Sequence, residues 1–161
     1  MSSPWRQLPP PARSIAFAVD DAMSAAARRD RVDFDEATTR LAALDPQQVG
    51  LVLGAVVRAL LEDLHPDGLA GDDIQAVLER CARGAAAWFP AVDAHVLLVL
   101  LAGALGVHDP DDDERPPSPL ALAQHGPILT ADLLAVAGRP LAGYLVASFA
   151  EIARAETVEL P

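Results

Sequence analysis

Apolar residues recur three or four positions apart through most of the chain, which is the spacing of one face of an α-helix. One such series is formed by Ile15, Val19, Ala22, Met23 and Ala26. No segment keeps up the two-residue alternation of a half-buried strand between turn residues. The pattern therefore predicts an all-α, single globular domain of about seven or eight helices with essentially no β-sheet.

Capping and breaking residues indicate where these helices begin and end. Asp45 followed by Pro46 is typical of an N-cap and a first helical position, and Asp33 with Glu36 three residues later suggests a capping box. His65 is expected to end a helix, because a residue that precedes proline is pushed out of the helical conformation. The expected helices cover residues 11–30, 32–44, 46–64, 72–89, 93–105, 118–126, 130–138 and 139–156.

The segment 93–105 is apolar on every face, with Asp93 as its expected N-cap and Gly106 as its stop. A helix without a polar face belongs in the interior of a domain. Its apolar run from Val96 to Val107 is only 12 residues long, well short of the roughly 20 residues that span a bilayer. We therefore expect a central apolar helix here, and not a membrane anchor.

Charge and composition narrow the classes of partner. The chain carries 12 basic and 23 acidic residues, a formal net charge of −11. Such a field repels phosphate backbones and anionic lipid headgroups, so we expect neither a nucleic-acid nor a membrane partner. The single cysteine, Cys81, excludes an internal disulfide, and the N-terminus lacks the apolar core of a secretory signal. We expect a cytoplasmic protein with a proline-rich arm, residues 1–12, before one helical domain, residues 13–161.

An acidic surface loop is expected at residues 107–119. Three of its aspartates have the first, third and fifth positions of a calcium-binding loop. The sixth position, however, is Glu114 where such a loop needs glycine, and the twelfth is Leu120 where it needs glutamate. The loop can attract divalent cations electrostatically but cannot enclose one, so we predict no metal site in it.

No catalytic or cofactor-binding pattern is recognisable in the sequence. It contains no GxSxG elbow, phosphate-binding loop or dinucleotide fingerprint, and its four histidines lack metal-site spacing. Cys81 lies on the apolar stripe of its helix and is interpreted as a packing residue. Gly50 and Gly54 are expected to let a neighbouring helix approach closely. We predict no catalytic residue, no cofactor and no metal, and regard an enzyme as the less favoured class.

Two segments, 65–72 and 125–132, share His, Leu and Asp at identical spacing, which leaves a weak internal duplication open. His65 and His125 are expected to bond the last carbonyls of their helices. In a duplicated fold they could instead face one another as a metal or acid-base site. A further alternative is a small-molecule-binding protein or enzyme with an apolar pocket between helices. Its polar groups would be His65, His125, Arg139 and Tyr144.

Three aromatic residues are candidates for anchoring a partner: Trp5 in the proline-rich arm, and Trp88 with Phe89 just before Pro90. Trp5 could also fold back onto its own domain. The leading hypothesis is a cytoplasmic, non-catalytic helical protein that acts through protein–protein contact. The partner would be a copy of itself, in a homo-oligomer that we expect to be a dimer, or another protein in an accessory or adaptor role.

Overall fold

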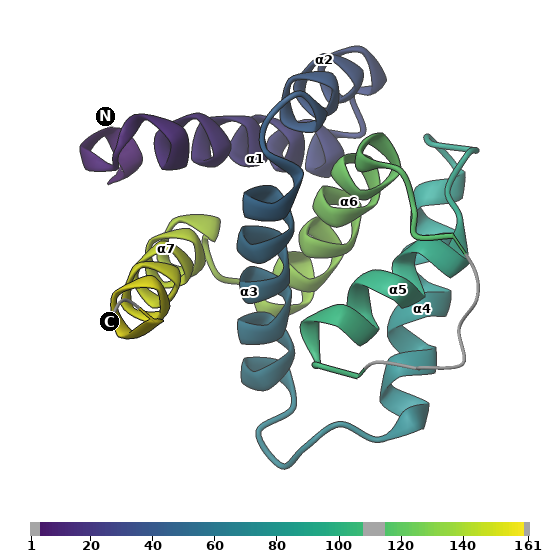
Figure 1. The fold of residues 1–161 in the computed structure, drawn as a ribbon. Helices are drawn as coiled ribbons and strands as arrows, with labels where there is room; N and C mark the ends of the chain where they lie inside the picture. Colours follow the sequence, from purple (N-terminus) through teal and green to yellow (C-terminus); the bar gives the residue numbers. More distant parts are fainter. Residues whose placement is uncertain (1–3, 108–114, 160–161) are drawn as a thin grey trace.

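The computed structural model describes residues 4–107 and 115–159. Within these residues a short 3-10 helix and seven α-helices form an array without any strand (Figure 1), which confirms the all-α prediction. The elements are η1 (Pro4–Gln7), α1 (Pro10–Arg28), α2 (Arg31–Ala42), α3 (Pro46–Leu64), α4 (Gly71–Ala86), α5 (Ala94–Ala104), α6 (Pro119–Ala137) and α7 (Leu141–Glu159).

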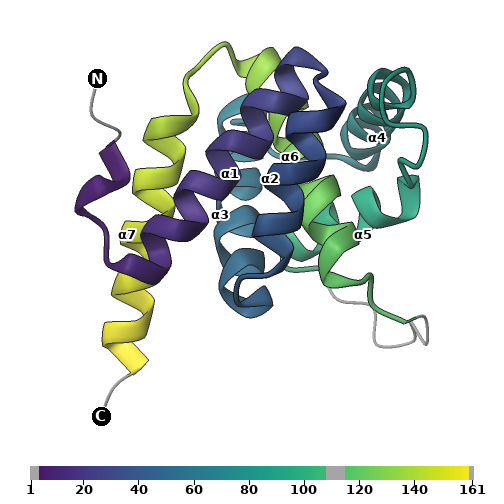
Figure 2. The same cartoon turned by 90° about the horizontal axis from the view of Figure 1, so that it is seen from above.

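Helix α6 occupies the centre of the array. It packs against each of the helices α1 to α5, and the two views in Figures 1 and 2 place it among them. In the described residues it is also the one helix long and apolar enough to cross a membrane by length and composition, a test that the core helix of a soluble protein passes too. Its position among five helices accounts for its apolar composition.

Helix α5 agrees with the predicted bounds to within one residue at each end but does not have the predicted place. Val96, Leu97, Leu101 and Ala104 are buried, whereas Leu98 is 43% exposed. The helix packs on α3, α4 and α6 and leaves one side open. The prediction of a central helix at residues 93–105 is therefore wrong in this respect, because an apolar composition does not fix how many neighbours a helix has.

The two short helices expected at residues 118–126 and 130–138 are one continuous helix, α6, with Pro127 inside it. Proline has no amide hydrogen, so the carbonyl of Ala123 loses its usual donor four residues on. The hydroxyl of Thr130 donates to the carbonyl of Gly126 at 2.7 Å in the same turn. Gly126 also lies against α3, where an added Cβ would come within 2.6 Å of Cδ1 of Leu53.

Several helix ends agree with the sequence prediction. Asp45 accepts a hydrogen bond from the amide of Gln47 at 3.0 Å, Asp93 accepts one from that of His95 at 2.9 Å, and α3 ends before His65. Two caps differ. Helix α2 is capped by Asp30, not by Asp33. Helix α4 begins at Gly71, and the carboxylate of Asp73 accepts a hydrogen bond from the amide of Ala70 at 2.9 Å, so the cap predicted at Asp72 is wrong.

The N-terminal segment packs on the helical array. Element η1 lies against α1 and α7, and α1 itself begins at Pro10, within the predicted arm of residues 1–12. Trp5 is 4% exposed and meets Phe17 edge to face, with ring centroids 6.5 Å apart. Helix α7 makes its main contacts with α3, α1 and η1. Because η1 contains Trp5, this segment helps to fix α7 on the array.

Candidate functional site

The residues proposed as partner anchors lie mainly in the interior. Phe89 is 1% exposed, and its ring centroid lies 5.5 Å from that of Phe34. The guanidinium of Arg31 covers the same ring at 4.5 Å. With Trp5 also buried, neither it nor Phe89 is presented to a partner, which corrects the expectation for these two residues. Trp88 is half-buried and lines a cavity described below.

Arg139 and Tyr144, two of the polar groups expected in a pocket, meet at one carboxylate. Both bind Oδ2 of Asp63, the guanidinium at 3.2 Å and the phenol hydroxyl at 2.8 Å. Burial, followed by the bond to Asp63, raises the pKa of Tyr144 above its ordinary value. These bonds connect the last turn of α3 with the start of α7, so their evident role is to hold the two helices together.

The two histidines of the predicted pocket lie in separate environments. His65 stands at the end of α3 as predicted, where its backbone amide donates to the carbonyl of Leu61, while Nδ1 of its imidazole lies 3.9 Å from Asp73. His125 lies inside α6 and not at a helix end, which corrects that expectation. Its Nε2 accepts from the amide of Asp93 at 2.9 Å, and its Nδ1 is 2.8 Å from the carbonyl of Ala121, to which it donates. Burial lowers the pKa of His125. Both of its ring nitrogens are thus engaged, and neither is free to hold a ligand.

The described residues offer no assembled catalytic or metal-binding set. They contain no group of three His, Cys, Asp or Glu side chains that could hold a metal ion. The aspartates of the predicted calcium-like spacing, and His108 beside them, lie outside the described residues. Burial, and then the carboxylate of Asp132, raises the pKa of Cys81 to about 12. Its sulfur is therefore a neutral thiol near pH 7 and a poor nucleophile.

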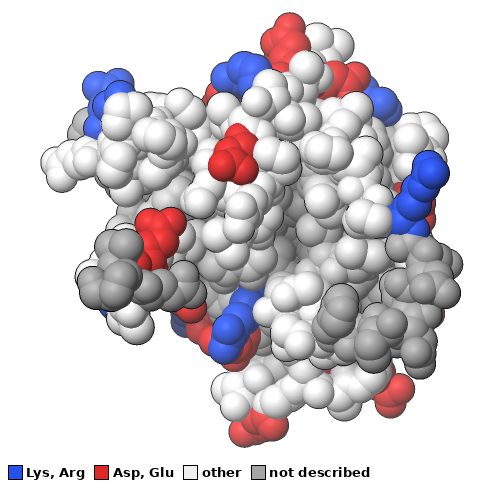
Figure 3. Space-filling model, in the orientation of Figure 1, with Lys and Arg blue, Asp and Glu red and all other residues white. Residues whose placement is uncertain are grey.

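An apolar groove crosses helix α3 between α7 and α5. We call it the α3 groove; its volume is about 430 Å³. Its residues are Gly50, Leu51, Gly54, Ala55 and Arg58 of α3, Val99, Leu100, Gly103 and Ala104 of α5, Leu122 of α6, and Glu151, Ile152 and Ala155 of α7. Figure 3 shows this face as largely uncharged, hollowed near its middle, with most charged side chains around the margins.

Three glycines keep the α3 groove open. A Cβ added to Gly50, Gly54 or Gly103 would meet no atom within 4 Å. The sequence predicts that Gly50 and Gly54 let a neighbouring helix approach closely, but among the described residues no helix fills the space that they clear. The sequence signal, two glycines four residues apart on one helix face, was present, but it does not reveal whether the surface that it clears is covered.

The lining of the α3 groove combines an exposed leucine with two opposite charges. Leu51 is 47% exposed. Arg58 on α3 is bonded to Glu62 at 3.1 Å, and Glu151 belongs to α7. Arg58 and Glu151 are the charged side chains among the residues that line the groove.

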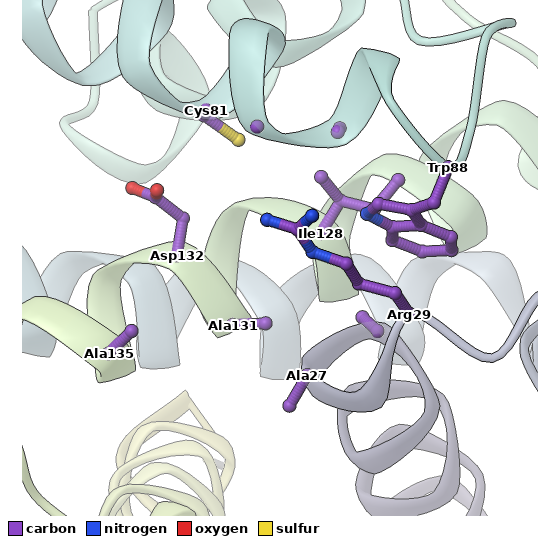
Figure 4. A pocket seen from close by; sticks show the side chains of 11 residues that line it. Ala27, Arg29, Cys81, Trp88, Ile128, Ala131, Asp132 and Ala135 are labelled. Carbon is purple, nitrogen blue, oxygen red and sulfur yellow. The ribbon is translucent and has the colours of Figure 1, made fainter.

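A second, smaller hollow of about 170 Å³ lies where α1, α4 and α6 meet; we call it the Trp88 cavity (Figure 4). Ala26, Ala27, Arg29, Cys81, Gly84, Ala85, Trp88, Ile128, Ala131, Asp132 and Ala135 line it. At one end the carboxylate of Asp132 is held by Arg80 through three contacts of 2.7 to 3.2 Å. No sequence motif predicted this cavity, because its residues come from three separate helices.

Comparison with known proteins gives no match: no family model, no curated protein and no solved structure is significantly similar to this chain.

Proposed function

We propose that the protein is non-catalytic and works through protein–protein contact, with the α3 groove as the contact surface between two copies of the chain. The observation that carries the proposal is the uncovered floor of Gly50, Gly54 and Gly103, above which a Cβ would meet nothing within 4 Å. Glycines in a helix cost stability relative to alanine. Three of them on one apolar face are accounted for if another helix approaches that face closely.

A second copy is the proposed occupant because the groove carries an exposed apolar side chain beside open space and one side chain of each charge. A twofold contact brings the same patch of both copies together, so each feature must find its complement on that patch. Leu51 protrudes beside the glycine floor, where the other copy offers the same open space. Arg58 of α3 and Glu151 of α7 carry opposite charges, and both line the groove. A twofold arrangement can place Arg58 of one copy against Glu151 of the other.

The expected dimer is weak, because the forces that favour and oppose it are of similar size. Fully burying an exposed leucine contributes about 1.5–3 kcal/mol, so the half-exposed Leu51 contributes about 1 kcal/mol in each copy. Two chains of net charge −11 repel each other, but at physiological salt charges separated by more than roughly 8 Å are largely screened. We therefore expect a weak dimer, in which added salt screens both the repulsion between the net charges and the attraction between Arg58 and Glu151.

Sedimentation equilibrium on the natural chain and on charge-reversal variants tests this proposal. The masses are expected to rise from 16.9 kDa toward twice that value with concentration. Arg58→Glu and Glu151→Arg should each weaken the dimer, and the double reversal should restore it. Arg83→Glu, which makes the same charge change as Arg58→Glu but on α4, is the matched control for that variant and should leave the dimer unchanged. A mass of 16.9 kDa at every concentration, or single reversals without effect, would contradict the proposal.

A further inference from the structure

Arg29 occupies a backbone conformation for which the rest of the described residues use glycine. It follows α1 with φ +57°, in the left-handed region. The other described residues with positive φ are Gly68, Gly106 and Gly138. A side chain is disfavoured at such a position and glycine is not. The arginine side chain at residue 29 is therefore present despite its backbone cost, which directs attention to what its guanidinium does.

The Arg29 guanidinium faces the Trp88 cavity without a carboxylate partner in the described part of the chain. Its neighbours are paired: Arg28 with Asp33 at 3.4 Å, and Arg31 with Asp35 at 2.9 Å. Figure 4 shows the Arg29 side chain reaching across the cavity, with its guanidinium between Trp88 and Asp132 in this view. An unpaired guanidinium beside a hollow is suited to bind a carboxylate through two parallel hydrogen bonds.

The remaining walls favour a short hydrocarbon chain. Ala26, Ala85, Ala131 and Ile128 contribute apolar surface, and the half-buried Trp88 forms one side. The hollow is partly open to solvent, and its volume of about 170 Å³ leaves room for roughly six to eight non-hydrogen atoms. Asp132 repels an anion little, because Arg80 neutralises it through three contacts.

We propose that the Trp88 cavity binds a small aliphatic monocarboxylate, with the carboxylate on Arg29 and a chain of about four carbons between Trp88 and the alanines of α1, α4 and α6. This site is separate from the α3 groove, and it stands or falls independently of the dimer.

Titration of the ¹⁵N-labelled protein with valerate tests the site, because the indole signal of Trp88 reports on the cavity and that of Trp5, buried near α7, is an internal reference. The Trp88 signal should shift saturably with a dissociation constant of about 1 mM or lower. Valeramide, which lacks the charge, and inorganic phosphate, which lacks the chain, should bind at least about tenfold more weakly.

Two arginine variants locate the contact. Arg29→Gln should weaken valerate binding at least about tenfold, whereas Arg28→Gln, one residue away and paired with Asp33, should leave it unchanged. Arg29→Gly should lose binding yet melt at a higher temperature, which separates loss of the ligand contact from loss of the fold. The proposal is overturned by an unsaturated shift up to about 20 mM valerate, by equal binding of valeramide or phosphate, or by equal losses in the two glutamine variants.

Discussion

Filling the α3 groove from within a single chain should separate its two expected consequences, a more stable monomer and a lost dimer. Gly54→Leu places a side chain where no atom lies within 4 Å of the added Cβ. Leucine gains about 0.8 kcal/mol over glycine in a helix interior. Partial burial of the new side chain in the groove adds about 1 kcal/mol. For a chain of 161 residues, each kcal/mol raises the melting temperature by roughly 2–4 °C.

The same leucine occupies the space that the second copy would enter. Melting curves at low concentration, where the protein is monomeric, should show the increase, because a bound partner also stabilises the fold. Sedimentation velocity at high concentration should show monomer only. Gly143→Leu is the control, since Gly143 lies on α7 outside the groove and also has open space above it. A Gly54→Leu variant that dimerises as the natural chain does would refute the role given to the groove.

Three other predictions concern the interior. Gly126→Ala should destabilise the fold by about 1 kcal/mol, because the added Cβ would lie 2.6 Å from Cδ1 of Leu53. Gly84→Ala, whose added Cβ would meet no atom within 4 Å, should stabilise the fold, and urea unfolding of the two variants compares them. Because burial lowers the pKa of His125 below 6.5, the unfolded chain binds more protons as pH falls below that value, so stability should decrease there, and less steeply in His125→Gln. The indole nitrogen of the buried Trp5 has no hydrogen-bond partner among the described residues. Trp5→Phe removes this unsatisfied donor, which favours folding, and also removes buried ring surface, which opposes it. The two effects should leave the unfolding free energy within about 1 kcal/mol of that of the natural chain; a loss of several kcal/mol in thermal melts would show that ring packing outweighs the unsatisfied donor.

Local signals predicted much of the helical framework. Asp45, Pro46 and His65 define both ends of α3, because capping and proline effects depend on residues adjacent in sequence. Asp93 caps α5 as expected, and the helix predicted to end at residue 138 does end there, with Gly138 as its C-cap. Such signals act within one turn of a helix, and they carry over into the fold with little interference from distant residues.

The misplaced features depend on tertiary packing. Pro127 should interrupt a helix by local rules, yet α6 continues through it among five packed helices. The apolar sequence of α5 does not indicate that Leu98 is exposed. Likewise, Gly54 clears a helix face in either case, and only the positions of α5 and α7 show that the face is open. The candidate site could not be predicted because the sequence does not show which faces remain uncovered.

The most direct test of the α3 groove as a self-association surface is a dilution series followed by ¹⁵N-amide NMR spectra. The amide signals of Gly50, Gly54 and Gly103 should move together as the concentration falls, whereas those of Gly84 and Gly143, outside the groove, should stay in place. Signals that do not change with concentration, or changes that centre on another face, would contradict the account.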